Sequence, residues 1–369
     1  MSKADKAKLD MQQFIEMESS KSMLKFITCG SVDDGKSTLI GRLLYDSQLL
    51  YDDQLVELKK DSKGRASTDE DIDFSLLVDG LAAEREQGIT IDVAYRFFST
   101  SKRKFIVADT PGHEQYTRNM ATGASTAEAA ILLIDARLGV STQTRRHAYI
   151  LSLVGVKHIL LAINKIDLKD YSQQVFEDIC ADFESFSRDL GFSSSYAIPI
   201  SALKGDNITS RSERMPWYEG QPLLTYLETL DPEREDSVKF RFPVQRVTRP
   251  DLNFRGYAGT LAGGEIAVGD EIMVAASLKR SRVKRIVTMD GDLPSASKGD
   301  AVTLTLEDEI DISQGDVLHS PGEPLERSNQ FQAHLIWMHE DPMLPERSYL
   351  LKIGAQTTSV QITDLKYAI

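Results

Sequence analysis

Hydrophobic residues between positions 23 and 235 occur in short continuous runs that alternate with helical stripes. Continuous apolar runs are typical of strands that are buried on both faces of a parallel sheet. The segments between them repeat apolar residues every three to four positions, which predicts amphipathic helices. This order predicts a doubly wound, mostly parallel α/β domain. The expected strands are Leu24–Cys29, Phe105–Asp109, Ala130–Asp135, Ile159–Asn164 and Tyr196–Ile200, and the clearest helical stripe comprises Val175, Phe176, Ile179, Phe183, Phe186 and Leu190.

Two stretches depart from this alternation. In Ile91–Phe97, the apolar residues Ile, Val, Tyr and Phe stand at every second position, which predicts an edge strand with those residues on its one dry face. Within a charged insertion at about residues 47–88, Phe74–Leu81 has apolar residues at the spacing of an amphipathic helix. Such a helix could pack on its own domain or face a partner, and the pattern leaves both interpretations open.

After residue 236 the pattern changes to short β-rich runs that are separated by glycine turns. Strands at this spacing predict a small β-barrel, with turns at the Gly-Asp pairs 269/270, 299/300 and 315/316. Phe331–Met338 and Tyr349–Ile362 are expected to be strands of a further, incomplete β-domain. The barrel strands are expected at Phe240–Val247, Gly256–Leu261, Glu271–Val274, Val283–Val287 and Val302–Leu306. The expected organisation is an N-terminal arm (1–22), an α/β domain (23–235), a β-barrel (236–327) and the start of a second β-domain (328–369).

Composition narrows the choice of partners. The chain of 369 residues has a formal net charge of −13, which opposes broad nucleic-acid binding because that requires a basic surface. Its two cysteines, Cys29 and Cys180, are too few for a disulfide framework and lack zinc-ligand spacing. No apolar run approaches the roughly 20 residues of a membrane span, and residues 1–22 lack the apolar centre of a signal peptide. A cytoplasmic protein without nucleic-acid or membrane partners is expected.

The most informative motif follows the first apolar run. A strand, a glycine loop, a Lys-Ser pair and a helix in this order form a phosphate-binding P-loop. Its backbone amides and the helix N-terminus attract phosphate oxygens. Lys36 is placed to reach the β- and γ-phosphates, and Ser37 to ligate Mg²⁺. The residues expected to bind nucleotide here are Gly30, Ser31, Val32, Asp33, Asp34, Gly35, Lys36, Ser37 and Thr38.

Two further motifs are placed to contact the γ-phosphate or its Mg²⁺. Asp109-Thr110-Pro111-Gly112 follows a strand, which places Asp109 to hold Mg²⁺ through water and the Gly112 amide to meet the γ-phosphate. Thr90, in Gln87-Gly88-Ile89-Thr90, can reach Mg²⁺ with its hydroxyl and release it after hydrolysis. Gly-Ile-Thr alone is a weak signal and gains weight from its position between the P-loop and Asp109.

Guanine is selected by two motifs that follow later strands. The Asp167 carboxylate of Asn164-Lys165-Ile166-Asp167 can accept both N–H groups of the guanine Watson–Crick edge, which adenine does not offer. Lys165 can lie along the plane of the base. Ser201-Ala202-Leu203 can donate a backbone N–H to guanine O6. The bound nucleotide is therefore expected to be GTP, with Mg²⁺.

His113 directly follows the γ-phosphate glycine, where a residue that orients water is needed. A lone histidine is more often structural, and here the surrounding motif favours a role in hydrolysis. Val32 and Ile89 could form an apolar gate around it. The expected catalytic residues are His113, Lys36 and Thr90, and the expected Mg²⁺ ligands are Ser37, Thr90 and, through water, Asp109.

In this order the motifs resemble those of translation-factor-type GTPases. Relatives of elongation factor Tu usually carry His where Ser31 and Asp34 stand. The P-loop with the Leu-Ile-Gly-Arg-Leu-Leu-Tyr-Asp that follows it, together with Val78–Phe98 and Met215–Gly220, instead resembles the GTPase (large) subunit of bacterial sulfate adenylyltransferase, or ATP sulfurylase. The resemblance extends from about residue 23 to the end of the sequence.

This resemblance implies a role in sulfate assimilation and cysteine biosynthesis. In that family a small, ATP-pyrophosphatase-type subunit transfers the adenylyl group of ATP to sulfate, and the GTPase subunit of the heterodimer or larger assembly couples GTP hydrolysis to this uphill step. The chain has one P-loop and no Ser-Gly-Gly-x-Asp-Ser loop, so adenylyl transfer is expected on another chain. Some members carry an adenylylsulfate kinase domain with its own P-loop, which these residues do not contain.

Two alternatives remain open at this point. The first is a translation elongation-type GTPase that binds tRNA or the ribosome, against which the acidic net charge and the residues at 31 and 34 weigh. The second is a nucleotide-gated scaffold without catalysis, against which the full motif set weighs.

Overall fold

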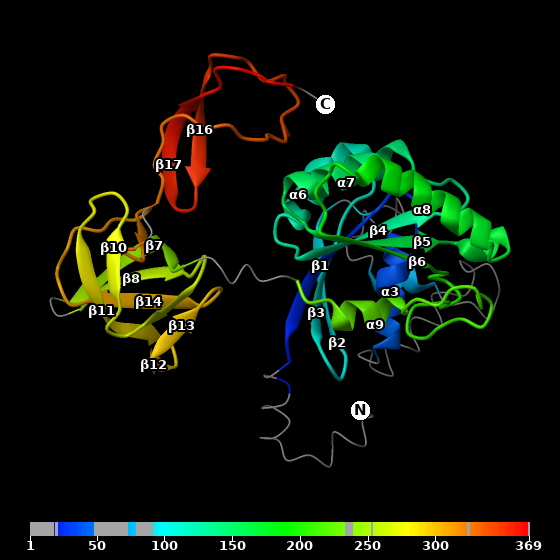
Figure 1. Ribbon diagram of the computed structural model, residues 1–369, viewed down its shortest axis with the longest axis horizontal. Helices are drawn as coiled ribbons and strands as arrows, with labels where there is room; N and C mark the ends of the chain where they lie inside the picture. Colours follow the sequence, from blue (N-terminus) through cyan, green and yellow to red (C-terminus); the bar gives the residue numbers. More distant parts are fainter. Residues whose placement is uncertain are drawn as a thin grey trace, which may run out of the picture. The chain divides into compact units, whose positions relative to one another are not determined.

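Figure 1 shows the computed structural model, which describes residues 18, 21–47, 73–78, 90, 92–232, 239–251, 254–322 and 325–367. Its contacts divide the chain into two compact units, Met1–Pro232 and Glu233–Ile369. Each unit is considered by itself. No helix in the described part of the chain is long and apolar enough to cross a membrane.

The first unit is built on a six-stranded sheet with the order β2-β3-β1-β4-β5-β6. All neighbouring strands are parallel except β2, which runs antiparallel to β3 at the edge. Every residue of β4 and β5 is buried, because helices cover both faces of the sheet. This confirms the predicted doubly wound α/β fold. The strands are β1 (Met23–Cys29), β2 (Ala94–Ser99), β3 (Lys104–Asp109), β4 (Ala129–Asp135), β5 (His158–Asn164) and β6 (Ser194–Pro199).

Helices form a layer on each side of this sheet. In Figure 1, α6, α7 and α8 lie on one side, and α3 and α9 lie on the other. The predicted stripe of α8 places Ile179 and Phe183 in the core. The carboxyl ends of the parallel strands meet at one edge, where ligands bind in open α/β sheets. The helices are α3 (Lys36–Asp46), α6 (Thr117–Ala124), α7 (Thr142–Leu153), α8 (Gln173–Ser187) and α9 (Leu223–Thr229), with 3₁₀-helices η1 (Phe74–Leu77), η2 (Glu114–Tyr116) and η3 (Ile166–Lys169).

The edge strand β2, Ala94–Ser99, overlaps the predicted Ile91–Phe97, but the prediction for its dry face is wrong. Phe98 is 3% exposed, whereas Tyr95 and Phe97 are 44% and 66% exposed. Phe98 stacks on Phe105 and meets the edge of Phe26, with ring centroids 4.8 and 6.2 Å apart. Alternation fixes which residues share a face, whereas the neighbouring aromatic rings decide which face is covered.

The amphipathic helix predicted around Phe74 is a short 3₁₀-helix, η1, in the described residues. Phe74 and Val78 are 5% and 3% exposed, and the Phe74 ring packs edge-on against Tyr45 of α3 at 5.2 Å. The Arg42 guanidinium lies over the same ring at 5.2 Å. The described part of the insertion therefore packs on its own domain. Leu81 and the remainder of the insertion, residues 48–72 and 79–88, lie outside the described residues.

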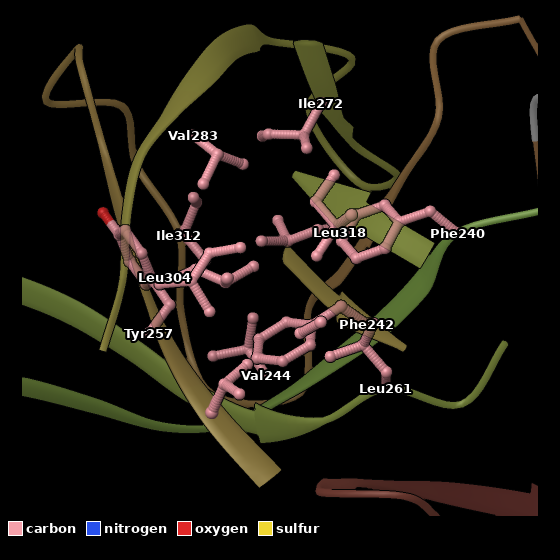
Figure 2. Packing of buried hydrophobic residues seen from close by; sticks show 14 of the residues in the cluster. Phe240, Phe242, Val244, Tyr257, Leu261, Ile272, Val283, Leu304, Ile312 and Leu318 are labelled. Atoms are coloured by element: carbon pink, nitrogen blue, oxygen red, sulfur yellow. The ribbon is translucent and has the colours of Figure 1, made fainter. Parts of the chain in front are cut away.

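The second unit contains a closed barrel. Its strands follow the order β10-β15-β7-β8-β14-β11-β12, and an added β10–β11 pairing closes the ring. Figure 2 shows side chains from all sides of the ring, including Phe242, Leu304 and Leu318, meeting in its interior. The strands are β7 (Arg241–Asp251), β8 (Phe254–Thr260), β10 (Glu271–Val274), β11 (Arg280–Thr288), β12 (Gly291–Leu293), β14 (Ala301–Leu306) and β15 (Val317–His319), with a separate pair, β9 (Glu265–Ala267) and β13 (Ser295–Ser297).

The three Gly-Asp pairs form turns of the same kind. Each glycine has a positive φ of 93° to 95°, a conformation that glycine adopts without strain. Each aspartate carboxylate accepts a hydrogen bond of 2.8 Å from the backbone N–H three residues earlier. Asp270, Asp300 and Asp316 thus brace three turns of the barrel as the sequence predicted.

Beyond the barrel, one of two strand predictions is wrong. Phe331–Met338 has no strand structure, and Phe331 and Leu335 are 59% and 58% exposed. An apolar run becomes a strand only where another strand satisfies its backbone groups. Tyr349–Ile362 does form strands, as a hairpin of β16 (Ser348–Ile353) and β17 (Gln356–Gln361) that turns at Gly354.

Candidate nucleotide-binding site

The P-loop joins β1 to α3 at the carboxyl edge of the sheet. Gly35, the N-cap of α3, has φ 92° and ψ 30°, and no side chain caps the helix. A Cβ atom at Gly35 would collide with the Asn164 amide, which explains the glycine. The first N–H groups of α3 therefore have no side-chain acceptor in the described residues, as an anion site at a helix N-terminus requires.

Lys36 is held inside the loop that it belongs to. Its Nζ donates to the carbonyl oxygens of Gly30 and Ser31, at 3.0 and 2.7 Å. It is 7% exposed, and burial lowers its pKa, although the neighbouring carboxylates of Asp34 and Asp109 oppose this. The loop therefore holds the Lys36 side chain in a fixed position.

Asp34 braces the same loop from within. Its buried carboxylate accepts a 2.5 Å hydrogen bond from the Ser31 N–H. Burial raises the pKa of this carboxyl, and Lys36 acts in the opposite direction. Asp33 beside it adopts a left-handed conformation with φ 67°. The loop conformation is therefore fixed by its own side chains.

The loop after β3 lies against the P-loop. A Cβ atom at Gly112 would collide with Lys36 Nζ and would lie 2.8 Å from the carbonyl carbon of Ser31. Asp109, 1% exposed, ends β3 and acts electrostatically on Lys36. The structure thus brings together the P-loop and the Asp109–Gly112 motif, which the sequence places at the γ-phosphate end of the site.

His113 follows Gly112 and is the N-cap of η2. Its Nδ1 accepts a hydrogen bond of 3.3 Å from the Gln115 N–H, and its side chain is half-buried. A neutral ring that accepts at Nδ1 carries its proton at Nε2. In this tautomer, Nε2 is a hydrogen-bond donor.

Asn164 connects three loops. Its Nδ2 donates to the Asp34 carbonyl at 2.8 Å, and its Oδ1 accepts from the Ala202 N–H at 3.0 Å. Both ends of the amide are therefore used inside the protein. Asn164 ties the P-loop to Ser201-Ala202-Leu203, in which Ser201 is 1% exposed.

Asp167 differs from Asn164 in how its side-chain oxygens are bonded. Among the described residues, its buried Oδ1 has no hydrogen-bond partner. A buried carboxylate oxygen without a donor costs free energy unless a ligand supplies one. The N–H groups of guanine are donors of the required kind, so the residues present fit this base.

Two predicted residues, Ser37 and Thr90, are placed with less detail. Ser37 is the second residue of α3, and its side chain is partly buried. Thr90 is described and partly buried, but Gln87, Gly88 and Ile89 lie outside the described residues, so the predicted gate of Val32 and Ile89 stays a prediction. Hydroxyl and carboxylate oxygens are the ligands that Mg²⁺ prefers, so Ser37, Thr90 and Asp109 fit this ion. Within the described ranges, no cluster of three or more His, Cys, Asp or Glu side chains offers a separate metal site.

Sequence reasoning missed Asp135. This residue ends β4 as Asp109 ends β3 and Asn164 ends β5, and it is 1% exposed. The Lys165 ammonium lies 3.1 Å and the Arg137 guanidinium 2.7 Å from its carboxylate. Burial raises the pKa of this carboxyl, but hydrogen bonds from Arg137 and Lys165 outweigh that effect and lower the pKa to about 2. A polar residue at the carboxyl end of three parallel strands of one sheet, β3, β4 and β5, was the signal that could have revealed it.

The N-terminal part of α7 was also missed. Its N-cap Ser141 lies 3.0 Å from the Ser31 hydroxyl, and Arg146 pairs with Glu114 at 2.6 Å. Gln143 bonds His147 Nε2 at 2.9 Å, and burial lowers the pKa of His147 to about 3, so this ring is neutral. The helix thereby contacts both the P-loop and the segment that follows Gly112.

Comparisons with known proteins agree with this geometry. The family described as the elongation factor Tu GTP binding domain matches residues 21–236, and the GTP-eEF1A C-terminal domain-like family matches residues 330–369. In fold alone, the chain is similar to the GTP-bound Ski7 GTPase-like domain of S. cerevisiae, with a TM-score of 0.53 and 19% identity over 98% of this chain and 88% of that one.

Among curated proteins, sulfate adenylyltransferase subunit 1 of Saccharophagus degradans is 54% identical over 99% of this chain and 78% of its own length. The subunit 1 of Shewanella oneidensis is 55% identical over 97% of this chain and 74% of its own length. The bifunctional enzyme NodQ of Rhizobium sp. (strain N33) is 59% identical over 97% of this chain. The chain spans 56% of the length of that NodQ.

Proposed function

Because this chain belongs to the sulfate adenylyltransferase subunit 1 family and has an elongation-factor-Tu-type GTP-binding domain, we propose that it is the GTPase subunit of a sulfate adenylyltransferase. In this role it couples GTP hydrolysis to the formation of adenosine 5′-phosphosulfate and pyrophosphate from ATP and sulfate. Adenylyl transfer takes place on a small, ATP-pyrophosphatase-type partner subunit. The observation that carries the proposal is identity of 54% and 55% to two relatives of that name over nearly the whole chain.

The site residues have separate tasks in this proposal. Lys36 and the first N–H groups of α3 bind the β- and γ-phosphates. Ser37, Thr90 and Asp109 hold Mg²⁺, with Asp109 acting through water, and the bound ion supplies charge neutralisation at the phosphates. The buried Oδ1 of Asp167 accepts from the base, with Asn164 and Ser201-Ala202-Leu203 shaping its pocket.

His113 orients the attacking water. Its Nδ1 accepts from the Gln115 N–H, and the residue directly follows the glycine that adjoins Lys36. Positioning and electrostatic stabilisation supply most of the catalysis in phosphoryl transfer, so an imidazole that orients water is sufficient for this task. The proteins named sulfate adenylyltransferase subunit 1 do not favour the translation or scaffold alternatives.

The proposal is tested with the chain bound to a sulfate adenylyltransferase small subunit. Adenosine 5′-phosphosulfate is measured with GTP, with GDP and without nucleotide, and GTP consumption is followed in parallel. We expect product to accumulate only with GTP, and GTP to be consumed alongside it. If the two chains form a complex and GTP changes nothing, the coupling role is wrong.

A further inference from the structure

Asp135 places a negative charge beside a site for a polyanionic nucleotide. Such a charge repels the phosphates unless cations neutralise it. The carboxylate is 1% exposed and accepts hydrogen bonds from the Arg137 backbone N–H at 2.9 Å, from Nε at 3.0 Å and from Nη2 at 2.7 Å. Besides Arg137, the carboxylate forms an ion pair with Lys165, whose Nζ lies 3.1 Å from Oδ2.

Lys165 is held at two points. Besides Asp135, its Nζ donates to the carbonyl oxygen of Asp33 in the P-loop. Its backbone has a left-handed conformation, with φ 59° and ψ 31°. The side chain therefore spans from the end of β5 to the P-loop, and its ammonium is fixed between the end of β4 and that loop.

We propose that Asp135 is a positioning residue for guanine nucleotides: it holds the Lys165 side chain ready along the plane of the base. Arg137 orients the Asp135 carboxylate, and Asp135 fixes Lys165 before the nucleotide arrives. A flexible lysine would lose rotamer entropy on binding, and fixing it in advance removes that cost. The inference depends on GTP binding by this domain and not on the sulfate reaction.

The test is Asp135→Asn in the full chain. The Asn side chain keeps the shape but offers a neutral amide to two cations, so Lys165 loses its charged anchor. We expect the affinities for GTP and GDP to fall about tenfold together, because both share the base, and kcat at saturating GTP to stay within about twofold. Fluorescent-nucleotide titration and single-turnover hydrolysis measure the two quantities.

A double-mutant cycle shows whether Asp135 acts through Lys165. In a Lys165→Met background, Asp135→Asn should weaken binding by less than about twofold. ITP lacks the 2-amino group from which Asp167 is proposed to accept, so the ratio of GTP to ITP affinity reports on Asp167. This ratio should stay at the wild-type value in Asp135→Asn. Asp182→Asn is the matched control, since it removes a carboxylate from an exposed pair with Arg145 at 2.7 Å and should change nothing.

Three outcomes would overturn the proposal. The first is that the losses of affinity in Asp135→Asn and Lys165→Met add fully in the double variant. The others are a changed ratio of GTP to ITP affinity in Asp135→Asn, or a loss of kcat in that variant without a loss of affinity. Should Asp135→Asn fail to fold, Arg137→Gln takes its place, because it leaves the Lys165 pair intact but frees the carboxylate to rotate. It should weaken binding about threefold in the wild type and not at all in Lys165→Met; equal losses in both would contradict the role.

Discussion

At the scale of single residues, Asn164 and Asp167 belong to one motif but face different partners. Asn164 uses both ends of its amide within the protein, whereas Asp167 keeps a buried oxygen that has no donor among the described residues. The first residue therefore shapes the pocket and the second is the one left to contact a base. The sequence motif predicts Asp167 as the base contact but not the use of Asn164 inside the protein, since that depends on which loops come together.

His113 provides the first prediction at this scale. His113→Ala should lower single-turnover GTP hydrolysis by about 10²-fold or more, since that is the usual size of such a contribution. GTP affinity should stay within about threefold, because the phosphates and base are bound by other residues. Single-turnover hydrolysis and nucleotide titration measure the two effects.

The control for this variant is His113→Gln, which keeps a side-chain donor. It should retain more hydrolysis than the alanine variant. The loss of the N-cap on η2 is expected to cost only about 1 kcal/mol, so the variant should remain folded. Unchanged turnover in His113→Ala would remove this residue from the mechanism.

At the scale of elements, α3 is packed between the sheet and the described part of the insertion. Gly41 lies in the middle of this helix, and a Cβ atom there would collide with the Phe74 carbonyl of η1. Phe74 also contacts Tyr45 and Arg42 on the same helix. A glycine that weakens helix propensity is therefore explained by the close approach of a second element.

Gly41→Ala should consequently destabilise the protein by about 1–3 kcal/mol, as overpacking does, despite the better helix propensity of alanine. The matched control is Gly123→Ala in α6, where the nearest atoms are side-chain ends at 3.0 to 3.4 Å that can shift. Its effect should be small. Chemical denaturation measures the free energy of unfolding of both variants. Equal values would show that η1 can move away from α3 without cost.

The elements also show how far the sequence could be interpreted. The parallel strands and the P-loop were predictable because each combines a strong apolar pattern with a glycine or polar terminus. The covered face of β2 was not, since Phe98 is buried by Phe105 of another strand. Short strands such as β15 have too few residues to show an apolar pattern. Phe331–Met338 shows such a pattern but has no partner strand among the described residues.

At the scale of the whole molecule, the described residues of the predicted nucleotide site all lie in the first compact unit. The P-loop, the ends of β3 and β5, and Ser201-Ala202-Leu203 are connected there by Asn164 and Lys36. The second unit has its own closed core, to which Phe242 and Leu304 belong. Ligand binding should therefore stabilise the two units unequally.

Hydrogen exchange with and without GDP tests this expectation. A ligand at about 100 times its Kd stabilises the state that binds it by about 2.7 kcal/mol, which slows exchange through opening roughly 100-fold. We expect this slowing in β1, α3 and β5, and a change below about twofold in β8 and β14 of the barrel. ADP in place of GDP should slow neither unit, because the proposed contact of Asp167 with the base selects guanine. Equal slowing in both units would show instead that they unfold together as one cooperative block. Nucleotide binding would then stabilise the barrel through this shared unfolding.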